Sequence, residues 1–124
     1  MALDAANHQL FIGSRNPAKL VVLDTDAAKI VTSVEGVERV GHTDDLWYDG
    51  AHKRIWPTSA SICPAGWRDR RFEQRDMDHY ALIARIPSVP GASTSFFVPD
   101  LNRLYVPATP YAGQPSVQVF EAQP

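Results

Sequence analysis

The segment 41–48 holds the residues whose types and spacing best suit chemistry. His42, Asp44 and Asp45 place one imidazole and two carboxylates within four positions. This set suits a divalent metal in a partly open site, where the ion polarises a substrate and activates water. Alternation along an extended chain would place His42 and Asp44 on one face and Asp45 on the other. The plainer interpretation is that the carboxylates cap a turn and that His42 is solvated.

A second candidate is His79, which has Asp76 and Asp78 as neighbours that could orient its imidazole. The alternative is an ordinary polar loop between strands. We predict that His42 and Asp44 bind the metal, and that Asp45 or His79 orients a ligand or accepts a proton. Zinc, calcium and manganese are the candidate ions, and no motif for an organic cofactor is visible. Two ligands from one chain are few, so a second copy would have to supply the others.

Length and charge restrict the classes of partner. The chain has 124 residues, which favours one domain, and its 12 basic against 14 acidic side chains give a net charge of −2. Nucleic-acid binding needs a dense basic face, so we expect no nucleic-acid partner. The single cysteine, Cys63, excludes an internal disulfide and a multi-cysteine zinc site. No apolar run approaches the roughly 18 residues of a membrane helix, and 1–9 lacks a signal-peptide pattern, which leaves the localisation open.

The elements that position the candidate site residues are predicted to be short strands. Ten prolines and seven glycines disfavour long helices. Apolar, β-branched runs at 19–23 and 29–34 flank a polar turn and predict a hairpin. Strict alternation predicts a strand at 116–121, and the run at 82–86 predicts a strand that stops at Pro87. The fold class is therefore expected to be all-β.

Three segments, 3–12, 48–57 and 97–106, align without gaps. Each has an apolar strand end, a polar turn and a return strand, and each carries one large ring at the same position; these rings are Phe11, Trp56 and Tyr105. A later strand ends in an acid each time, at Asp24, Glu73 and Glu121. The offset of roughly 45 to 49 residues fits a four-stranded propeller blade.

The segment 97–106, followed by 117–121, resembles the YVTN-type (quinoprotein-amine-dehydrogenase-like) β-propeller repeat, with Asn102-Arg103-Leu104-Tyr105-Val106 as the closest match. The resemblance implies one domain, a partial propeller of about three four-stranded blades at 1–36, 37–90 and 91–124. Members of the family have about seven blades, so this chain resembles a fragment. Propellers host many functions, and the resemblance therefore says little about chemistry.

Two departures from the repeat affect the expected assembly. The stretch 56–71 has two prolines and a charged cluster, so whether it forms a strand is open, and the last blade ends before a fourth strand. An arc of blades exposes unpaired strands at both ends. We therefore expect self-association, most simply a homodimer of two arcs that closes a six-bladed ring. A trimer or a rearranged barrel are the alternatives.

Two classes of function remain from the sequence. The first is a binding or scaffold module with a small-molecule, peptide or metal site on the central channel. The second is a metal-dependent hydrolase of an ester, lactone or phosphoester, because propeller lactonases and esterases, which the chain resembles in fold only, hold an ion on the axis.

Overall fold

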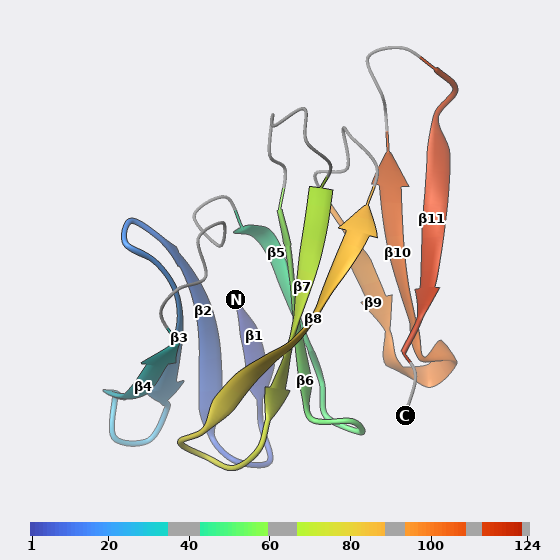
Figure 1. Ribbon diagram of the computed structural model, residues 1–124. Coiled ribbons are helices and arrows are strands. Elements are labelled where there is room, and N and C mark those ends of the chain that lie inside the picture. The colour runs from blue at the N-terminus through green and yellow to red at the C-terminus, as the bar shows by residue number, and fades with distance from the viewer. Residues whose placement is uncertain (35–42, 60–66, 89–93, 109–112, 123–124) are drawn as a thin grey trace.

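The protein is all-β, as the sequence predicts. The computed structural model describes residues 1–34, 43–59, 67–88, 94–108 and 113–122, which form eleven strands and one 3-10 turn, η2 (Pro99–Leu101). The strands make three antiparallel sheets (Figure 1). In these ranges no helix has the length and the apolar character needed to cross a bilayer.

Each sheet joins strands that follow one another along the chain. The first sheet contains β1 (Ala2–Asp4), β2 (Gln9–Arg15), β3 (Ala18–Asp24) and β4 (Lys29–Val34). The second contains β5 (Thr43–Asp49), β6 (Arg54–Ser59), β7 (Trp67–Gln74) and β8 (Tyr80–Ser88). The third contains β9 (Phe96–Val98), β10 (Arg103–Ala108) and β11 (Ser116–Glu121). Every pairing is antiparallel, so each sheet is a meander.

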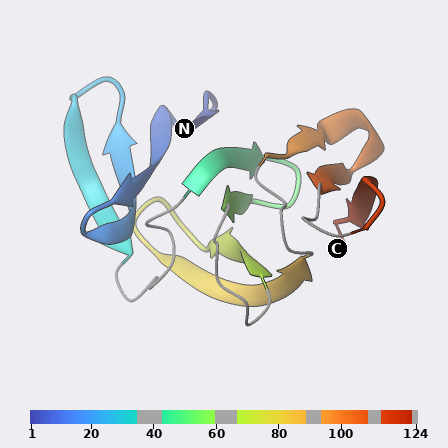
Figure 2. The ribbon, with the colours of Figure 1, turned by 90° about the horizontal axis from the view of Figure 1, so that it is seen from above.

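The three sheets spread like a fan. Seen from above, β1, β5 and β9 lie on the inner side of the fan, and β4, β8 and β11 lie toward its outside (Figure 2). The turns β1–β2, β3–β4, β5–β6, β7–β8 and β9–β10 all lie at one end of the molecule, the lower end in Figure 1. We call this end the turn end and the other the opposite end. Because neighbouring strands run in opposite directions, their first residues lie at opposite ends of the molecule.

Prolines explain where the strands differ from expectation. The predicted hairpin forms as β3 and β4. The prediction that the strand at 82–86 stops at Pro87 was wrong, because β8 continues to Ser88. β8 is an edge strand, where a missing N–H can face away from the sheet. Part of the stretch 56–71 is also strand. In the described register, β6 pairs with β7 at Arg54 and Ile55, before Pro57, so the missing N–H of Pro57 interrupts neither pair.

The aligned segments share one turn geometry. His8, Lys53 and Asn102 occupy the same place in them, and each has a φ between 53° and 55°. A left-handed residue allows a tight connection between two strands. The next residue pairs across the sheet with the acid noted above, as Gln9 with Asp24, Arg54 with Glu73 and Arg103 with Glu121.

The same turns also share a backbone hydrogen bond. The carbonyl of the left-handed residue accepts from an N–H of a later strand end, at 2.8 to 3.0 Å in the three cases. The donors are Thr25, Gln74 and Ala122, each directly after the paired acid. Three segments that align in sequence therefore close their turns in the same way.

Two apolar clusters hold the sheets against one another. Between the first and second sheets, the buried side chains are those of Phe11, Leu20, Val22, Leu46, Ile55 and Phe72. Between the second and third sheets, they are those of Trp56, Phe97, Leu104, Val106, Ala108 and Ala122. The second sheet is thus covered on both faces, and the first and third are each covered on one.

Candidate functional site

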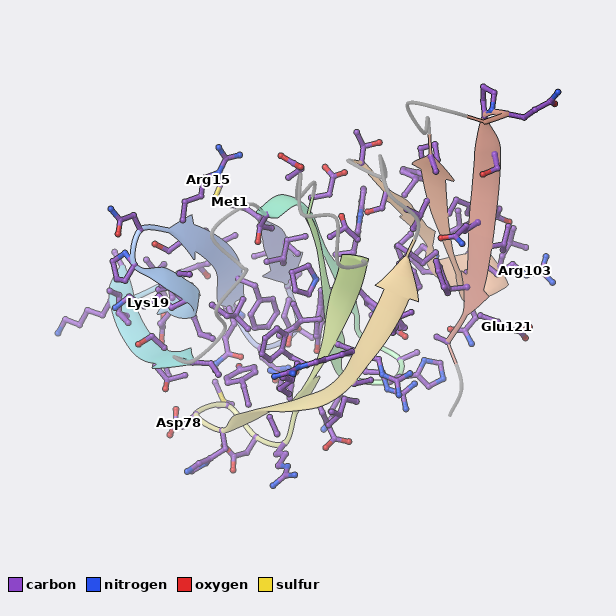
Figure 3. The ribbon with its side chains drawn as sticks, turned by 45° about the horizontal axis from the view of Figure 1, so that its top comes forward. Met1, Arg15, Lys19, Asp78, Arg103 and Glu121 are labelled. Carbon is purple, nitrogen blue, oxygen red and sulfur yellow. The ribbon has the colours of Figure 1, made fainter. Side chains whose placement is uncertain are left out.

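The predicted site residues do not gather in one place. Asp44 and Asp45 lie at the start of β5, at the opposite end, whereas His79 lies in the turn before β8. β5 and β8 run antiparallel, which puts their first residues at opposite ends of the second sheet. In Figure 3, Arg15 and Met1 lie at one end of the molecule and Asp78, the neighbour of His79, at the other. His42 lies outside the described residues.

A β-bulge separates the two carboxylates of β5. The register passes from Thr43 opposite Ser59 directly to Asp45 opposite Thr58, so Asp44 is the extra residue. Asp44 is exposed, and its Oδ1 lies 3.5 Å from Nη2 of Arg15 on the first sheet. Asp45 contacts a residue on the way to the third sheet instead. The two side chains therefore contact different neighbours.

Gly13 allows the approach that brings Arg15 close to Asp44. A Cβ built on Gly13 would lie 3.0 Å from Cβ and Cγ2 of Thr43, tighter than ordinary van der Waals contact. β2 can therefore lie against the start of β5 only with glycine at this position or with a local shift. Two residues further along β2, Arg15 reaches Asp44.

Asp45 takes part in a compact set of hydrogen bonds between the second and third sheets. Its Oδ2 accepts from the Ser95 N–H at 2.7 Å. The Ser95 hydroxyl accepts from Nε1 of Trp47 at 2.8 Å and lies 2.8 Å from the Thr58 hydroxyl. A charge-assisted hydrogen bond to a backbone N–H is among the stronger kinds. In this structure Asp45 positions the chain that enters β9.

An open groove runs beside Asp44. Its lining belongs to the start of the first sheet and to β5, namely Met1, Ala2, Leu3, Asp44, Asp45, Leu46, Trp47 and Tyr48, and its volume is about 330 Å³. β1 and β5 are edge strands, each with a sheet neighbour on one side only. Edge strands present backbone donors and acceptors. The groove therefore offers a carboxylate, backbone groups and apolar side chains to a small ligand.

Three histidines form pairs with aspartates near the turn end. Nδ1 of His79 lies 2.8 Å from Asp76, Nδ1 of His52 lies 2.7 Å from Asp49, and Nδ1 of His8 lies 3.0 Å from Asp26.

Asp76 also accepts hydrogen bonds from the backbone of the loop that carries His79. The backbone N–H groups of Asp78 and His79 donate to Asp76 Oδ1, and these bonds, with the His79 side chain, lower the pKa of Asp76. His79 lines a second hollow, between β4 and β8, of about 360 Å³. The contacts match the polar-loop alternative, while the hollow leaves the ring within reach of a ligand.

A buried polar cluster near the turn end was not anticipated. Gln74 donates to Oε1 of Gln9 at 2.8 Å, and its own Oε1 accepts from the Tyr48 hydroxyl at 2.7 Å. The Tyr80 hydroxyl donates to Oε1 of Gln9 at 2.7 Å, and Gln9 donates to the Met77 carbonyl at 2.8 Å. Both tyrosine hydroxyls donate in this cluster, and burial raises the pKa of both tyrosines.

One signal in the sequence could have found part of this cluster. Gln9 precedes Phe11 by two positions, so strand alternation puts its amide on the same buried face as the ring. A buried amide requires partners, which predicts polar side chains on the facing sheet. No comparable signal points to Arg15 or Ser95, because their contacts depend on how the sheets stack.

In the described ranges, no three His, Cys, Asp or Glu side chains come together as a metal-ligand group. Comparison of the chain with protein-family models, with curated proteins and with solved structures gives no match. Function must therefore be argued from the geometry of the chain itself.

Proposed function

We propose that this chain is a propeller-type binding module in which the three sheets act as blades and a ligand site lies on their inner strands. Support comes from the meander order of each sheet, from the fan that places β1, β5 and β9 on the inner side (Figure 2), and from the shared turn geometry. In propellers, the innermost strands face the central channel. A ligand on this side would contact β1 and β5.

The observation that carries the proposal is the groove at the start of β5 with Asp44 at its edge. The bulge exposes the Asp44 carboxylate, and Arg15 provides a cation 3.5 Å from it. A divalent ion would compete with the guanidinium for this carboxylate, with His42 as its predicted second ligand. A small polar molecule would instead use the pair as a matched donor and acceptor.

Arg15 distinguishes the two kinds of ligand. We would titrate the protein with Zn²⁺, Ca²⁺ and Mn²⁺ separately by calorimetry, after treatment with a chelator. If the site takes a metal, Asp44→Asn and His42→Ala abolish binding, and Arg15→Ala strengthens it because a competing cation is gone. Asp26→Asn, which removes an exposed carboxylate beside His8, is the matched control and leaves binding unchanged.

Two results would contradict a metal site at Asp44. One is metal binding that survives Asp44→Asn; the other is the loss of binding in Asp26→Asn to the same degree. If none of the ions binds, the groove remains a site for a small polar molecule. That form of the proposal fails if a fragment screen by NMR moves no backbone signals of β1 or β5.

The metal-dependent hydrolase remains the second proposal, and the geometry favours it less. Its proton-transfer residues, Asp45 and His79, lie at opposite ends of the second sheet, and Asp45 holds the Ser95 N–H. A single site on one chain can therefore contain Asp45 or His79, but not both. Assays of ester, lactone and phosphoester hydrolysis in the metal-loaded protein, with Asp44→Asn as control, test this alternative directly.

A further inference from the structure

The first sheet has an apolar outward face. One row crosses all four of its strands, in the pairing order Leu3, Leu10, Leu23 and Ile30. Phe11 is fully buried toward the second sheet, so its neighbour Leu10 and the rest of the row point away from it. Leu3 is 55% and Ile30 is 67% exposed. This face, the Leu3 face, lies at one end of the fan (Figure 2).

The third sheet has a matching outward face at the other end of the fan. Leu104 is buried toward the second sheet, so Tyr105 points outward, with Phe96 and Val119 paired beside it. Phe96 is 60% and Val119 is 52% exposed, although the Phe96 ring also meets Trp47 edge-on at 5.3 Å. We call this surface the Tyr105 face. Contiguous exposed apolar surfaces of this kind mark interaction sites.

The two junctions inside the chain show what covers such a face. Phe11 of the first sheet packs against Tyr48 of the second, with ring centroids 5.0 Å apart. Trp56 of the second sheet stacks on Phe97 of the third at 6.4 Å. In each junction, a ring from one hairpin meets the residue that begins the next aligned segment.

Within the described part of the chain, the same rule leaves one ring and one apolar residue without such a match. Tyr105 stands where Phe11 and Trp56 stand in their segments, and Leu3 stands where Tyr48 and Phe97 stand. By continuation of the series, Tyr105 should meet a residue equivalent to Tyr48. Leu3, at the other end of the fan, holds the equivalent position, and the Leu3 of a second copy could meet Tyr105.

We propose that the Tyr105 face docks head-to-tail on the Leu3 face of a second copy of this chain. The proposal rests on the blade-like stacking in the proposed function, and because Leu3 also lines the groove, it is tested without a ligand. Both faces are apolar across their rows, and the stacking would continue the two junctions already present. A head-to-tail contact forms a closed ring when its rotation permits, and two copies with six sheets are the simplest such ring.

Mixing two blocked variants tests the head-to-tail arrangement. We would measure mass by light scattering and native mass spectrometry, in chelator, over roughly a hundredfold range of concentration. The unmodified chain should give one species larger than a monomer. Leu3→Glu and Tyr105→Glu should each be monomeric, and an equal mixture should associate, because the first keeps its Tyr105 face and the second its Leu3 face. Met77→Glu, at an exposed apolar residue of the turn end, should leave the mass unchanged.

Circular dichroism shows whether each variant is folded, and Ile30→Lys and Val119→Lys replace either variant that is not. The proposal is wrong if the folded, unmodified chain stays monomeric throughout, if the mixture fails to associate, or if Met77→Glu disrupts the assembly equally. Because no ligand is added and the chelator removes metal ions, a failure to associate is distinct from a failure of the groove to bind a ligand.

Discussion

The two internal junctions use the same aromatic position but different polar contacts. The Phe11 ring, between the first and second sheets, contacts Tyr48 and Tyr80, whose hydroxyls bond to the buried amides of Gln74 and Gln9 near the turn end. At Trp56, between the second and third sheets, the buried ring nitrogen has no hydrogen-bond partner among the described residues, and the polar contact of this junction is that of Asp45 with Ser95 at the opposite end. The aromatic ring is therefore common to both junctions, whereas the polar contacts lie at the turn end in the first junction and at the opposite end in the second.

This difference assigns separate roles to apolar and polar side chains. Stacking is tolerant, because Phe11 meets Tyr48 with tilted rings while Trp56 and Phe97 are nearly parallel. The polar contacts are specific, because each donor needs a partner at a fixed place once water is excluded. A junction made only by stacking, such as the proposed contact with a second copy, should accordingly be the most easily separated of the three.

The largest expected effect comes from removing a stacking ring. Phe11→Ala and Trp56→Ala each empty a buried position, so each should lower the free energy of unfolding by about 3–5 kcal/mol in chemical denaturation. Met77→Ala, at an exposed turn residue, should change it by about 0.5 kcal/mol or less. A loss of under about 1 kcal/mol at Phe11 would show that its ring does not determine the junction.

Removing an amide from the buried cluster should have a smaller effect. Gln74→Leu removes the amide that accepts from the Tyr48 hydroxyl and donates to Oε1 of Gln9, at a cost of about 1–3 kcal/mol. The double variant with Gln9→Leu should cost less than the sum of the two single variants, because the Gln9–Gln74 bond can be lost only once. Strict additivity of the two substitutions in denaturation experiments would contradict the coupling.

Removing the polar contact of the second junction should lower the free energy of unfolding by a smaller amount still. Asp45→Ala removes the charge-assisted bond to the Ser95 N–H, and the expected loss is about 1.5 kcal/mol because Asp45 is only half-buried. Hydrogen exchange followed by NMR should show faster exchange at Ser95 and β9 and unchanged rates in β2 and β3. Equally faster hydrogen exchange in all three sheets would mean that Asp45 does not stabilise this junction locally.

The smallest effect concerns acid. Burial acts to raise the pKa of Asp4, but hydrogen bonds from Asn7, Tyr48 and Gln74 outweigh it and leave this pKa below its ordinary 3.8. A carboxyl group with a lowered folded pKa stabilises the fold above its unfolded pKa, and this contribution disappears as pH falls through the folded value. Asp4→Asn should therefore flatten the decline in stability below pH 3.8 in acid titrations followed by circular dichroism. An unchanged decline would place the acid sensitivity elsewhere.

Sequence reasoning reached the local structure and stopped at the contacts between sheets. Alternation and turn residues predicted the strands, and the alignment of three segments marked Phe11, Trp56 and Tyr105 as equivalent. Both depend on neighbours within one hairpin. The Gln9–Gln74 and Asp45–Ser95 contacts join residues 65 and 50 positions apart, which no local pattern encodes. The site is predicted less well for the same reason, since Arg15 meets Asp44 only through the packing of Gly13 on Thr43.

The most direct test of the repeated stacking is an isotope-filtered NOE experiment on the unmodified chain. Equal amounts of labelled and unlabelled protein would be mixed, so that only contacts between copies are observed. The account predicts signals between the Tyr105 ring of one copy and the Leu3 methyl groups of another. Tyr105-to-Tyr105 contacts, or no contact between copies in a sample with the mass of an oligomer, would contradict it.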